Sequence, residues 1–308
     1  MVKRLIDCSA NEMKEMDKQE LLKAIALSEG RVMACETIGA VQPMLGNITN
    51  AEFAASMGAD MLILNMFDVN EPQVWGLPKV EKSETIREIK RLTGRMIGVN
   101  LEPADQSFSA GSDDDTWSLT NGRQATLQNA KTVCAMGADM IVLTGNPGIG
   151  VQNRAIIESL RTISKELGDK VILTAGKMHA SGLLKEAGQN LITKQDIKDF
   201  AEAGADIILM PAPGTVPGIT MEYIRELVAY AHSLGALTIT AVGTSQEGAD
   251  RETIRQIALL CKMTGTDMHH LGDAGYIGMA LPENIMAYSV AIKGIRHTYR
   301  RMARSINR

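Results

Sequence analysis

Short apolar runs alternate with longer amphipathic segments along the whole chain. Four of the runs follow nearly the same tripeptide, Gly-Ala-Asp at 58–60, 137–139 and 204–206 and Gly-Thr-Asp at 265–267. The glycine suits a left-handed residue just after a helix, and a short apolar run bounded by turn signals is typical of a strand buried on both faces. Each copy therefore predicts the end of a helix and the start of a buried strand.

Further apolar runs lie between the marked ones, at 31–36, 95–102, 170–177 and 236–243, which gives eight predicted strands. The segments between them are long enough to connect parallel strands through helices. This pattern predicts a closed (β/α)8 TIM barrel in which residues 1–308 form a single domain. An open doubly wound sheet is the alternative, and it would have fewer strands and a glycine-rich fingerprint after the first one.

Three segments lie outside this repeat. The N-terminal segment, 1–29, contains an amphipathic helix over 9–29 that we expect to close the bottom of the barrel. The irregular stretch 103–122 is predicted to be a lid, because barrel active sites lie at the C-terminal ends of strands. Residues 282–308 are predicted to be helical, with arginines that face solvent or another subunit. Capping patterns are expected at Ser9 with Glu12 and at Thr193 with Asp196.

Composition limits where the protein works and what it binds. There is no run of roughly 18 apolar residues for a membrane span, and the start lacks the apolar core of a signal peptide. The four cysteines have no metal-type spacing, which is typical of reduced thiols in the cytoplasm. A net charge of −4 gives no basic surface for nucleic acid. We therefore expect a cytoplasmic homo-oligomer that binds a small molecule, without nucleic acid or membrane as a partner.

Polar residues gather at the predicted C-terminal ends of the strands, where barrel enzymes carry their catalytic groups. A rim this polar indicates function, because each buried polar group needs a partner to offset its desolvation. His269 and His270 point to opposite faces of their strand, so at most one can face the barrel axis. The residues predicted to bind substrate at this rim are Asn65, Asn100, Thr144, Asn146 and His270.

Lys177 is the first candidate for catalysis. It ends an apolar strand, where burial and nearby cations lower the pKa of a lysine and favour a base or an imine-forming nucleophile. His179 has the same strand parity and can relay a proton. The alternative is that Lys177 pairs with Glu36, with Glu102 or with a substrate phosphate.

Three carboxylates follow the first three predicted strands. Glu36, Asp68 and Glu102 can supply a general acid and base, or can hold Mg2+ or Mn2+ together with Asn or His. Each can also simply orient Lys177 or cap a loop. No local metal-binding motif distinguishes the metal-binding role from the acid–base role, so no residue is assigned as a metal ligand. Whether the protein uses a divalent ion as a cofactor is left open.

The glycine-rich ends of the last two strands predict an anion site, because exposed backbone N–H groups there can bind phosphate. Asp273 is an acidic neighbour that can bind a sugar hydroxyl instead. The residues of this predicted phosphate and substrate site are Gly243, Thr244, Ser245, Gly272, Asp273 and Ala274.

The strand order, with Ala241-Val242-Gly243-Thr244-Ser245 and Leu271-Gly272-Asp273-Ala274-Gly275, resembles the phosphate-binding (β/α)8 barrel enzymes over residues 30–280. That group includes phosphosugar epimerases, aldolases and the indole-glycerol-phosphate synthase type. The chain also looks distantly like the phosphoenolpyruvate mutase and isocitrate lyase group. The resemblance implies a barrel enzyme that acts on a small phosphorylated molecule.

Three functions follow from these residues. The first is a lyase or isomerase of a small phosphorylated sugar or sugar acid, with Lys177 as base or imine former and Glu36, Glu102 and His179 assisting. The second is a hydrolase of a phosphorylated glycoside that uses two carboxylates from Glu36, Asp68 and Glu102. The third is a barrel without catalysis that binds a phosphosugar and regulates a partner.

Overall fold

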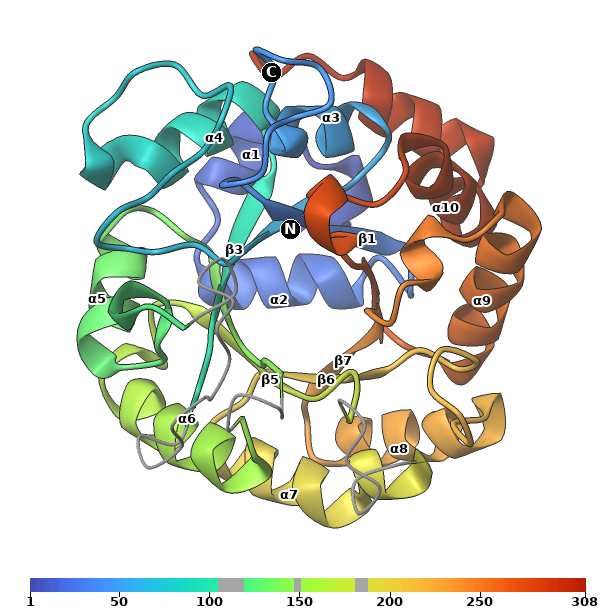
Figure 1. The fold of residues 1–308 in the computed structure, drawn as a ribbon. Coiled ribbons are helices and arrows are strands. Elements are labelled where there is room, and N and C mark those ends of the chain that lie inside the picture. The colour runs from blue at the N-terminus through green and yellow to red at the C-terminus, as the bar shows by residue number, and fades with distance from the viewer. Residues whose placement is uncertain (105–118, 147–150, 181–187) are drawn as a thin grey trace.

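The computed structural model describes residues 1–104, 119–146, 151–180 and 188–308, and within them the strands close into a barrel (Figure 1). Every strand pairs in parallel with its neighbours in sequence, and β1 also pairs with β8. This confirms the predicted (β/α)8 barrel. The strands are β1 Val32–Ile38, β2 Met61–Asn65, β3 Met96–Leu101, β4 Met140–Leu143, β5 Ile172–Gly176, β6 Ile207–Pro211, β7 Leu237–Val242 and β8 Met268–Leu271.

Helices surround the barrel and cover its outer face (Figure 1). They are α1 Ala10–Lys14, α2 Lys18–Ala26, α3 Asn50–Ser56, α4 Thr85–Thr93, α5 Leu127–Ala135, α6 Asn153–Leu167, α7 Lys194–Ala203, α8 Met221–Ser233, α9 Arg251–Thr264 and α10 Pro282–Ala303. Most of the expected lid, 103–122, falls on residues 105–118, outside the described residues. Its last residues form a 3-10 turn, Asn121–Arg123.

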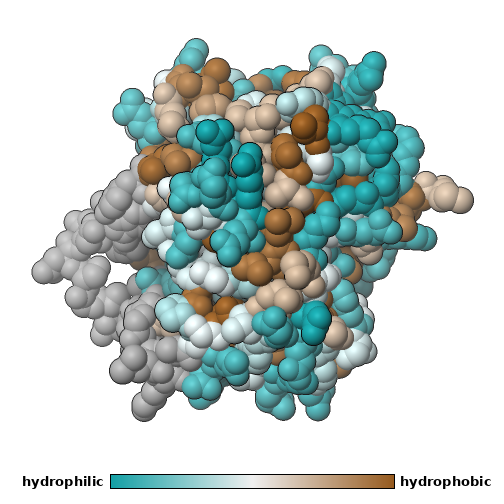
Figure 2. Space-filling view, turned by 90° about the vertical axis from the view of Figure 1, so that its right-hand side faces the viewer, coloured by the Kyte–Doolittle hydropathy of each residue, from teal (hydrophilic) through white to brown (hydrophobic). Residues whose placement is uncertain are grey.

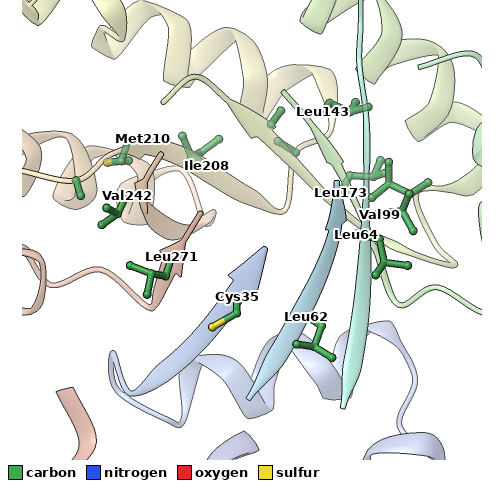
Figure 3. Packing of buried hydrophobic residues seen from close by; sticks show 14 of the residues in the cluster. Cys35, Leu62, Leu64, Val99, Leu143, Leu173, Ile208, Met210, Val242 and Leu271 are labelled. Carbon is green, nitrogen blue, oxygen red and sulfur yellow. The ribbon is translucent and has the colours of Figure 1, made fainter. Parts of the chain in front are cut away.

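Apolar side chains form two layers, one on each face of the strands. Residues that point outward pack against the helices, among them Leu62, Leu64 and Val99 (Figure 3). Residues that point inward, such as Met61 and Ile63, form a second cluster inside the barrel. Because side chains alternate along a strand, burial of both faces requires the uninterrupted apolar runs that the sequence shows.

The N-terminal segment closes the bottom of the barrel, as predicted. Leu21 and Ile25 of α2 belong to the same cluster as the inward-facing residues of the strands, and α2 crosses the barrel in Figure 1. The expectation of one helix over 9–29 is wrong, because α1 and α2 are separate helices. Asp17 starts the second one with its own capping box to Glu20, which favours a new N-terminus over a continuous helix.

The Gly-x-Asp repeat has a structural role at the bottom of the barrel. Each glycine has a positive φ and each aspartate accepts a hydrogen bond from a backbone N–H near the start of the preceding strand. The carboxylate therefore ties each even-numbered strand to the odd-numbered strand before it. The pairs are Asp60 with Met33, Asp139 with Ile97, Asp206 with Leu173 and Asp267 with Thr238, at 2.8–2.9 Å.

Each of these aspartates also contacts a cationic or titratable side chain. The partners differ in burial, from fully buried Lys293 beside Asp60 to half-exposed His232 beside Asp267. The expectation that the arginines near the C-terminus face solvent or another subunit is wrong for Arg301. Its guanidinium is buried and donates to Asp60 at 2.7 Å, because the Asp60 carboxylate inside the fold requires a counter-charge.

The predicted capping box at Thr193 is formed. Its hydroxyl accepts from the Asp196 N–H, and the Thr193 N–H donates to the Asp196 carboxylate at 2.8 Å. We expect Thr193→Ala to lower the free energy of unfolding by about 1 kcal/mol, because it leaves helix N–H groups without their acceptor. Urea unfolding measures this, with Thr162→Ala in the exposed middle of α6 as the matched control. An equal effect of the two substitutions would contradict the capping role.

Exposed apolar side chains lie on α9 and α10, where Figure 2 shows them interspersed with hydrophilic ones. They are Leu259, Met263, Ile295 and Tyr299. The homo-oligomer expected from the last helix stays a prediction. In the described part of the chain, no helix combines the length and the hydropathy that a membrane crossing requires.

Candidate active site

A buried Glu–His pair lies at the C-terminal ends of two neighbouring strands. Glu36 on β1 and His270 on β8 are 6% and 1% exposed, and Glu36 Oε2 lies 3.0 Å from His270 Nε2. A carboxylate at this distance accepts a hydrogen bond, so Nε2 carries a proton that points at Glu36. Within the described residues, His270 Nδ1 is buried and has no hydrogen-bond partner.

The neighbouring histidine points the other way, as the strand parity predicts. His269 lies 3.1 Å from the Tyr288 hydroxyl of α10 and 3.1 Å from the Gly30 carbonyl oxygen. Burial lowers the pKa of His269 to about 4, so this ring is neutral. His269 is therefore a structural group, and His270 is the histidine of the rim.

A second set of polar groups connects β2, β3 and the loop after β8. Asn65 donates to Asp273 Oδ2 at 2.8 Å, and its carbonyl oxygen lies 3.0 Å from the Asn100 amide. The Gly275 N–H donates to the other oxygen of Asp273 at 2.9 Å. The structure therefore joins three of the predicted substrate-binding residues in one hydrogen-bonded group.

Asp273 and Glu247 are carboxyls with raised pKa values. Burial, together with the negative charges of Glu36 and Glu247, raises the pKa of Asp273 to about 7 against the hydrogen bond from Asn65. Burial also raises the pKa of Glu247. Glu247 is 5% exposed, and its Oε2 has no hydrogen-bond partner in the described residues. At least one group of this rim therefore titrates near neutral pH.

The backbone is strained at three places around the rim. Met66, Ser245 and Ala274 have positive φ values of 53°, 78° and 56°, and they follow the ends of β2, β7 and β8. Side chains other than glycine rarely adopt this region, and such strain concentrates at functional sites. Here the strain turns the chain sharply at the points where the polar groups project.

The predicted phosphate site is lined by the chain's own acids. Glu247 accepts from the Ser245 N–H, and the Thr244 hydroxyl donates to the Thr215 carbonyl oxygen at 2.8 Å. A Cβ on Gly272 would lie 3.5 Å from the Glu247 carboxyl carbon, and one on Gly243 would lie 2.2 Å from Met178 Sδ. Carboxylates beside these N–H groups repel an anion, which weighs against phosphate at this position.

Glu102 and Asp68 have partners of their own. Arg123 donates to Glu102 through Nε at 3.0 Å, and both side chains are buried. Burial raises the pKa of Glu102 although Arg123 opposes it. Asp68 accepts from the N–H groups of Asn70 and Glu71 at 2.8 and 3.1 Å, so it caps the loop after β2. This arrangement favours the structural alternative for Asp68 over a catalytic one.

The remaining predicted residues lie at the ends of β4 and β5. Lys177 and Thr144 are each 3% exposed, and the Thr144 hydroxyl has no hydrogen-bond partner in the described residues. His179 is half-buried; burial lowers its pKa and the charge of Glu36 opposes that effect. Asn146 is exposed.

The structure adds two residues to the predicted set. Arg123 comes from the end of the long segment after β3. It is distant from Glu102 in the sequence, so no local pattern indicated that the two side chains pair. Glu247 follows the glycine-containing end of β7. A carboxylate there can accept hydrogen bonds from the backbone N–H groups that were predicted to bind an anion. Across the ranges that the structure describes, no three His, Cys, Asp or Glu side chains are close enough to hold a metal ion together.

The fold and this rim define a (β/α)8 barrel protein with buried acid–base groups at the strand ends where barrel active sites lie. The chain belongs to the family described as a domain of unknown function, DUF7916, whose model matches residues 6–308. A comparison with curated proteins gives no match to the sequence.

Solved structures with the same fold include aldolases and a carboxyl transferase. An archaeal fructose 1,6-bisphosphate aldolase is 11% identical, with a TM-score of 0.57 over 90% of this chain and 99% of its own. A Schiff base forming fructose-1,6-bisphosphate aldolase is 12% identical, with a TM-score of 0.56 over 88% and 99%. The carboxyl transferase domain of Rhizobium etli pyruvate carboxylase is 11% identical, with a TM-score of 0.53 over 95% of this chain and 52% of its own. At this identity the likeness shows the fold alone.

Proposed function

We propose that this protein is a lyase or isomerase that removes a proton next to the carbonyl group of a small sugar or sugar acid. The observation that carries the proposal is the buried Glu36–His270 pair beside Asp273 at the strand ends. A base and an acid that exchange protons near neutral pH suit this reaction class.

The residues divide into a base and an acid. His270 Nδ1 takes the proton from carbon, and Glu36 stabilises the imidazolium that forms, since it accepts from Nε2. Asp273 in its acid form donates a proton to the carbonyl oxygen, which gives an enediol. Asn65 orients Asp273 through its hydrogen bond. In an isomerase, His270 then returns its proton to the former carbonyl carbon, while the hydroxyl on the carbon that lost the proton gives its own proton to Asp273 and becomes the new carbonyl group.

Lys177 supports a second way to activate the carbonyl. Its amine can attack the carbonyl carbon and release water, and the resulting imine withdraws electrons as the protonated carbonyl does. Its position directly after β5 and its burial favour this role over a surface charge. The fold likeness to a Schiff base forming aldolase makes the imine worth testing first.

Trapping with borohydride tests the imine. We expect protein incubated with dihydroxyacetone phosphate, dihydroxyacetone or pyruvate and then reduced to gain one covalent adduct on Lys177, read by peptide mass spectrometry. Lys177→Ala should show only the background of surface lysines. The matched control is Lys18→Ala, because Lys18 is also buried but lies at the bottom of the barrel beside Asp206. An adduct that persists in Lys177→Ala rules out the imine.

The same compounds test the phosphate predicted from the sequence. Turnover of the phosphorylated compound alone supports a phosphosugar substrate. Turnover of the unphosphorylated compounds would support a substrate without phosphate, as expected where the carboxyls of Glu247 and Asp273 lie at the ends of β7 and β8. Tight binding without turnover of any compound would favour the regulator over the enzyme.

The hydrolase has weaker support from the geometry. Glu102, one of its predicted carboxylates, is held by Arg123, and Asp68 caps a loop. An ion pair and backbone hydrogen bonds keep these groups in fixed structural roles. Release of sugar from an aryl glycoside, lost in Glu36→Gln, would reverse this preference.

A further inference from the structure

A cavity of about 570 Å³ lies at the bottom of the barrel, at the end opposite the rim. It is bounded by α1, by α4, by Met96 at the start of β3 and by the C-terminal residues Ile306 and Asn307. Cavities of this size hold small organic ligands. The rim residues are at the other ends of the same strands, so this is a separate place in the fold.

The walls of the cavity are rich in positive charge. One carboxylate, Asp139, belongs to the lining, and Lys90 binds it at 2.8 Å. Two arginines of α4 reach acids outside the lining: Arg87 pairs with Glu84, the N-cap of α4, and Arg91 pairs with Glu88 within the helix. The cationic lining residues are Lys14, Arg87, Lys90, Arg91 and Arg95.

Among the residues that the structure describes, two of these cations have no carboxylate partner. Within the described ranges, Lys14 forms no ion pair with a carboxylate. Arg95 is 6% exposed and donates to backbone carbonyl oxygens only, including that of Ala59 at 2.7 Å and that of Arg301 at 3.0 Å. Burial, reinforced by the charge of Arg301, lowers the pKa of Arg95 to about 9. The field in the cavity therefore favours an anion.

The floor of the cavity is apolar. Met13 and Met96 are buried, and Ile306 is 37% exposed beside them. Because the two methionines are already buried, the apolar side chain that a ligand can remove from water is Ile306, and a bare inorganic anion would leave it exposed. Arginines arranged around such a floor suit phosphate groups, because their planar guanidinium groups form paired hydrogen bonds to phosphate oxygens.

We propose that this cavity binds a small organic phosphate, with its phosphate groups at Lys14, Arg87 and Arg91 and its apolar part on Met13, Met96 and Ile306. The site is independent of the reaction proposed for the rim. Arg95 contributes charge, because it is buried and its donors bind backbone carbonyl oxygens. Arg87 and Arg91 are 49% and 62% exposed, and because exposed ion pairs contribute little, they can exchange Glu84 and Glu88 for a phosphate.

The ligand would join segments from both ends of the chain. The Asn11 N–H already donates to the Arg308 carbonyl oxygen at 2.8 Å, and Gly94 packs between Ala10 and Ile306. Binding only to the folded state raises the midpoint of thermal unfolding as ligand is added. We therefore expect occupancy to stabilise the terminal segments against exchange of their amide hydrogens.

Calorimetric titration tests the site with three probes: ADP, pyrophosphate and adenosine. ADP should bind, pyrophosphate should bind about tenfold more weakly, and adenosine should not bind. Lys14→Ala and Arg91→Ala should each weaken ADP binding about tenfold, the usual effect of one charge-assisted hydrogen bond. The matched control is Lys198→Ala on α7, which removes an exposed i,i+4 lysine partner of Glu202 far from the cavity lining.

The outcomes separate this cavity from the rim. Equal affinity for ADP and pyrophosphate would overturn the organic part of the proposal. Binding that survives both Lys14→Ala and Arg91→Ala, or that is lost in Lys177→Ala at the rim, would overturn the site itself. Absence of heat and of a thermal shift with every probe would do the same. Both cavity variants change exposed side chains, and circular dichroism verifies that they fold.

Discussion

Replacing Asp60 by asparagine is expected to lower the free energy of unfolding by about 3–5 kcal/mol, because it leaves buried cations without their counter-charge. Asp60 is 0% exposed and contacts Lys293 at 2.5 Å and Arg301 at 2.7 Å. Both partners are also buried. Burial raises the pKa of Asp60, but the two cations outweigh it and hold the pKa below its ordinary value.

Asparagine has nearly the same shape as the aspartate at position 60 but carries no charge. Its amide oxygen can still accept from the Met33 N–H, which the carboxylate binds at 2.9 Å. The expected loss therefore reports the ion pairs and not the bond to the strand. Lys293→Met in the Asp60→Asn background should recover part of the loss, since one buried cation is then removed as well.

Urea unfolding at neutral pH measures this effect. Asp267→Asn is the matched control, because Asp267 occupies the same position of the repeat but its partner His232 is 40% exposed. A half-exposed pair contributes little, so we expect a change of at most about 1 kcal/mol there. Equal losses at Asp60 and Asp267 would show that burial of the partner does not set the energy.

Replacing Asp273 by asparagine is expected to have opposite effects on stability and on activity. Turnover should fall by about 10²–10⁴-fold, since the proposed general acid is lost. The free energy of unfolding at pH 7.5 should rise by about 2 kcal/mol, because an ionised carboxyl no longer has to be buried among Glu36 and Glu247.

The sign of the expected change in the free energy of unfolding follows from its pH dependence. The pKa of Asp273 is raised from 3.8 to about 7 in the folded protein, so the folded state holds a proton that the unfolded state has released between these values. Stability from this group therefore falls as pH rises from about 4 to about 7. Asparagine removes this part of the decline.

Unfolding curves at pH 4.5, 6 and 7.5 test the prediction, together with turnover at the same pH values. Asp250→Asn is the control, because Asp250 is an exposed helix cap and asparagine caps a helix about as well. A parallel pH dependence for wild type and Asp273→Asn would show that Asp273 titrates near its ordinary value. Unchanged turnover would remove it from the proposed mechanism.

Local pattern was enough for the architecture and for part of the site. The barrel could be predicted from the apolar runs. A strand that is buried on both faces is an unbroken apolar stretch, which can be recognised from a few neighbouring residues. The opposite directions of His269 and His270 followed from strand parity, and the boxes at Ser9 and Thr193 from residues three apart. Each of these signals is contained within a few neighbouring residues.

Contacts between segments that are distant in the sequence could not be predicted from such local patterns. The sequence showed that the Gly-x-Asp motif is repeated, but only the fold shows that Asp60 meets Lys293 and Arg301 from the last helix. The sequence placed Glu36 and His270 at one rim, whereas their 3.0 Å contact depends on closure of β1 against β8. The same holds for Glu247, whose carboxyl lies where phosphate was expected. Local propensities determine which elements form, while pairing and charge compensation depend on the three-dimensional packing that brings those elements together.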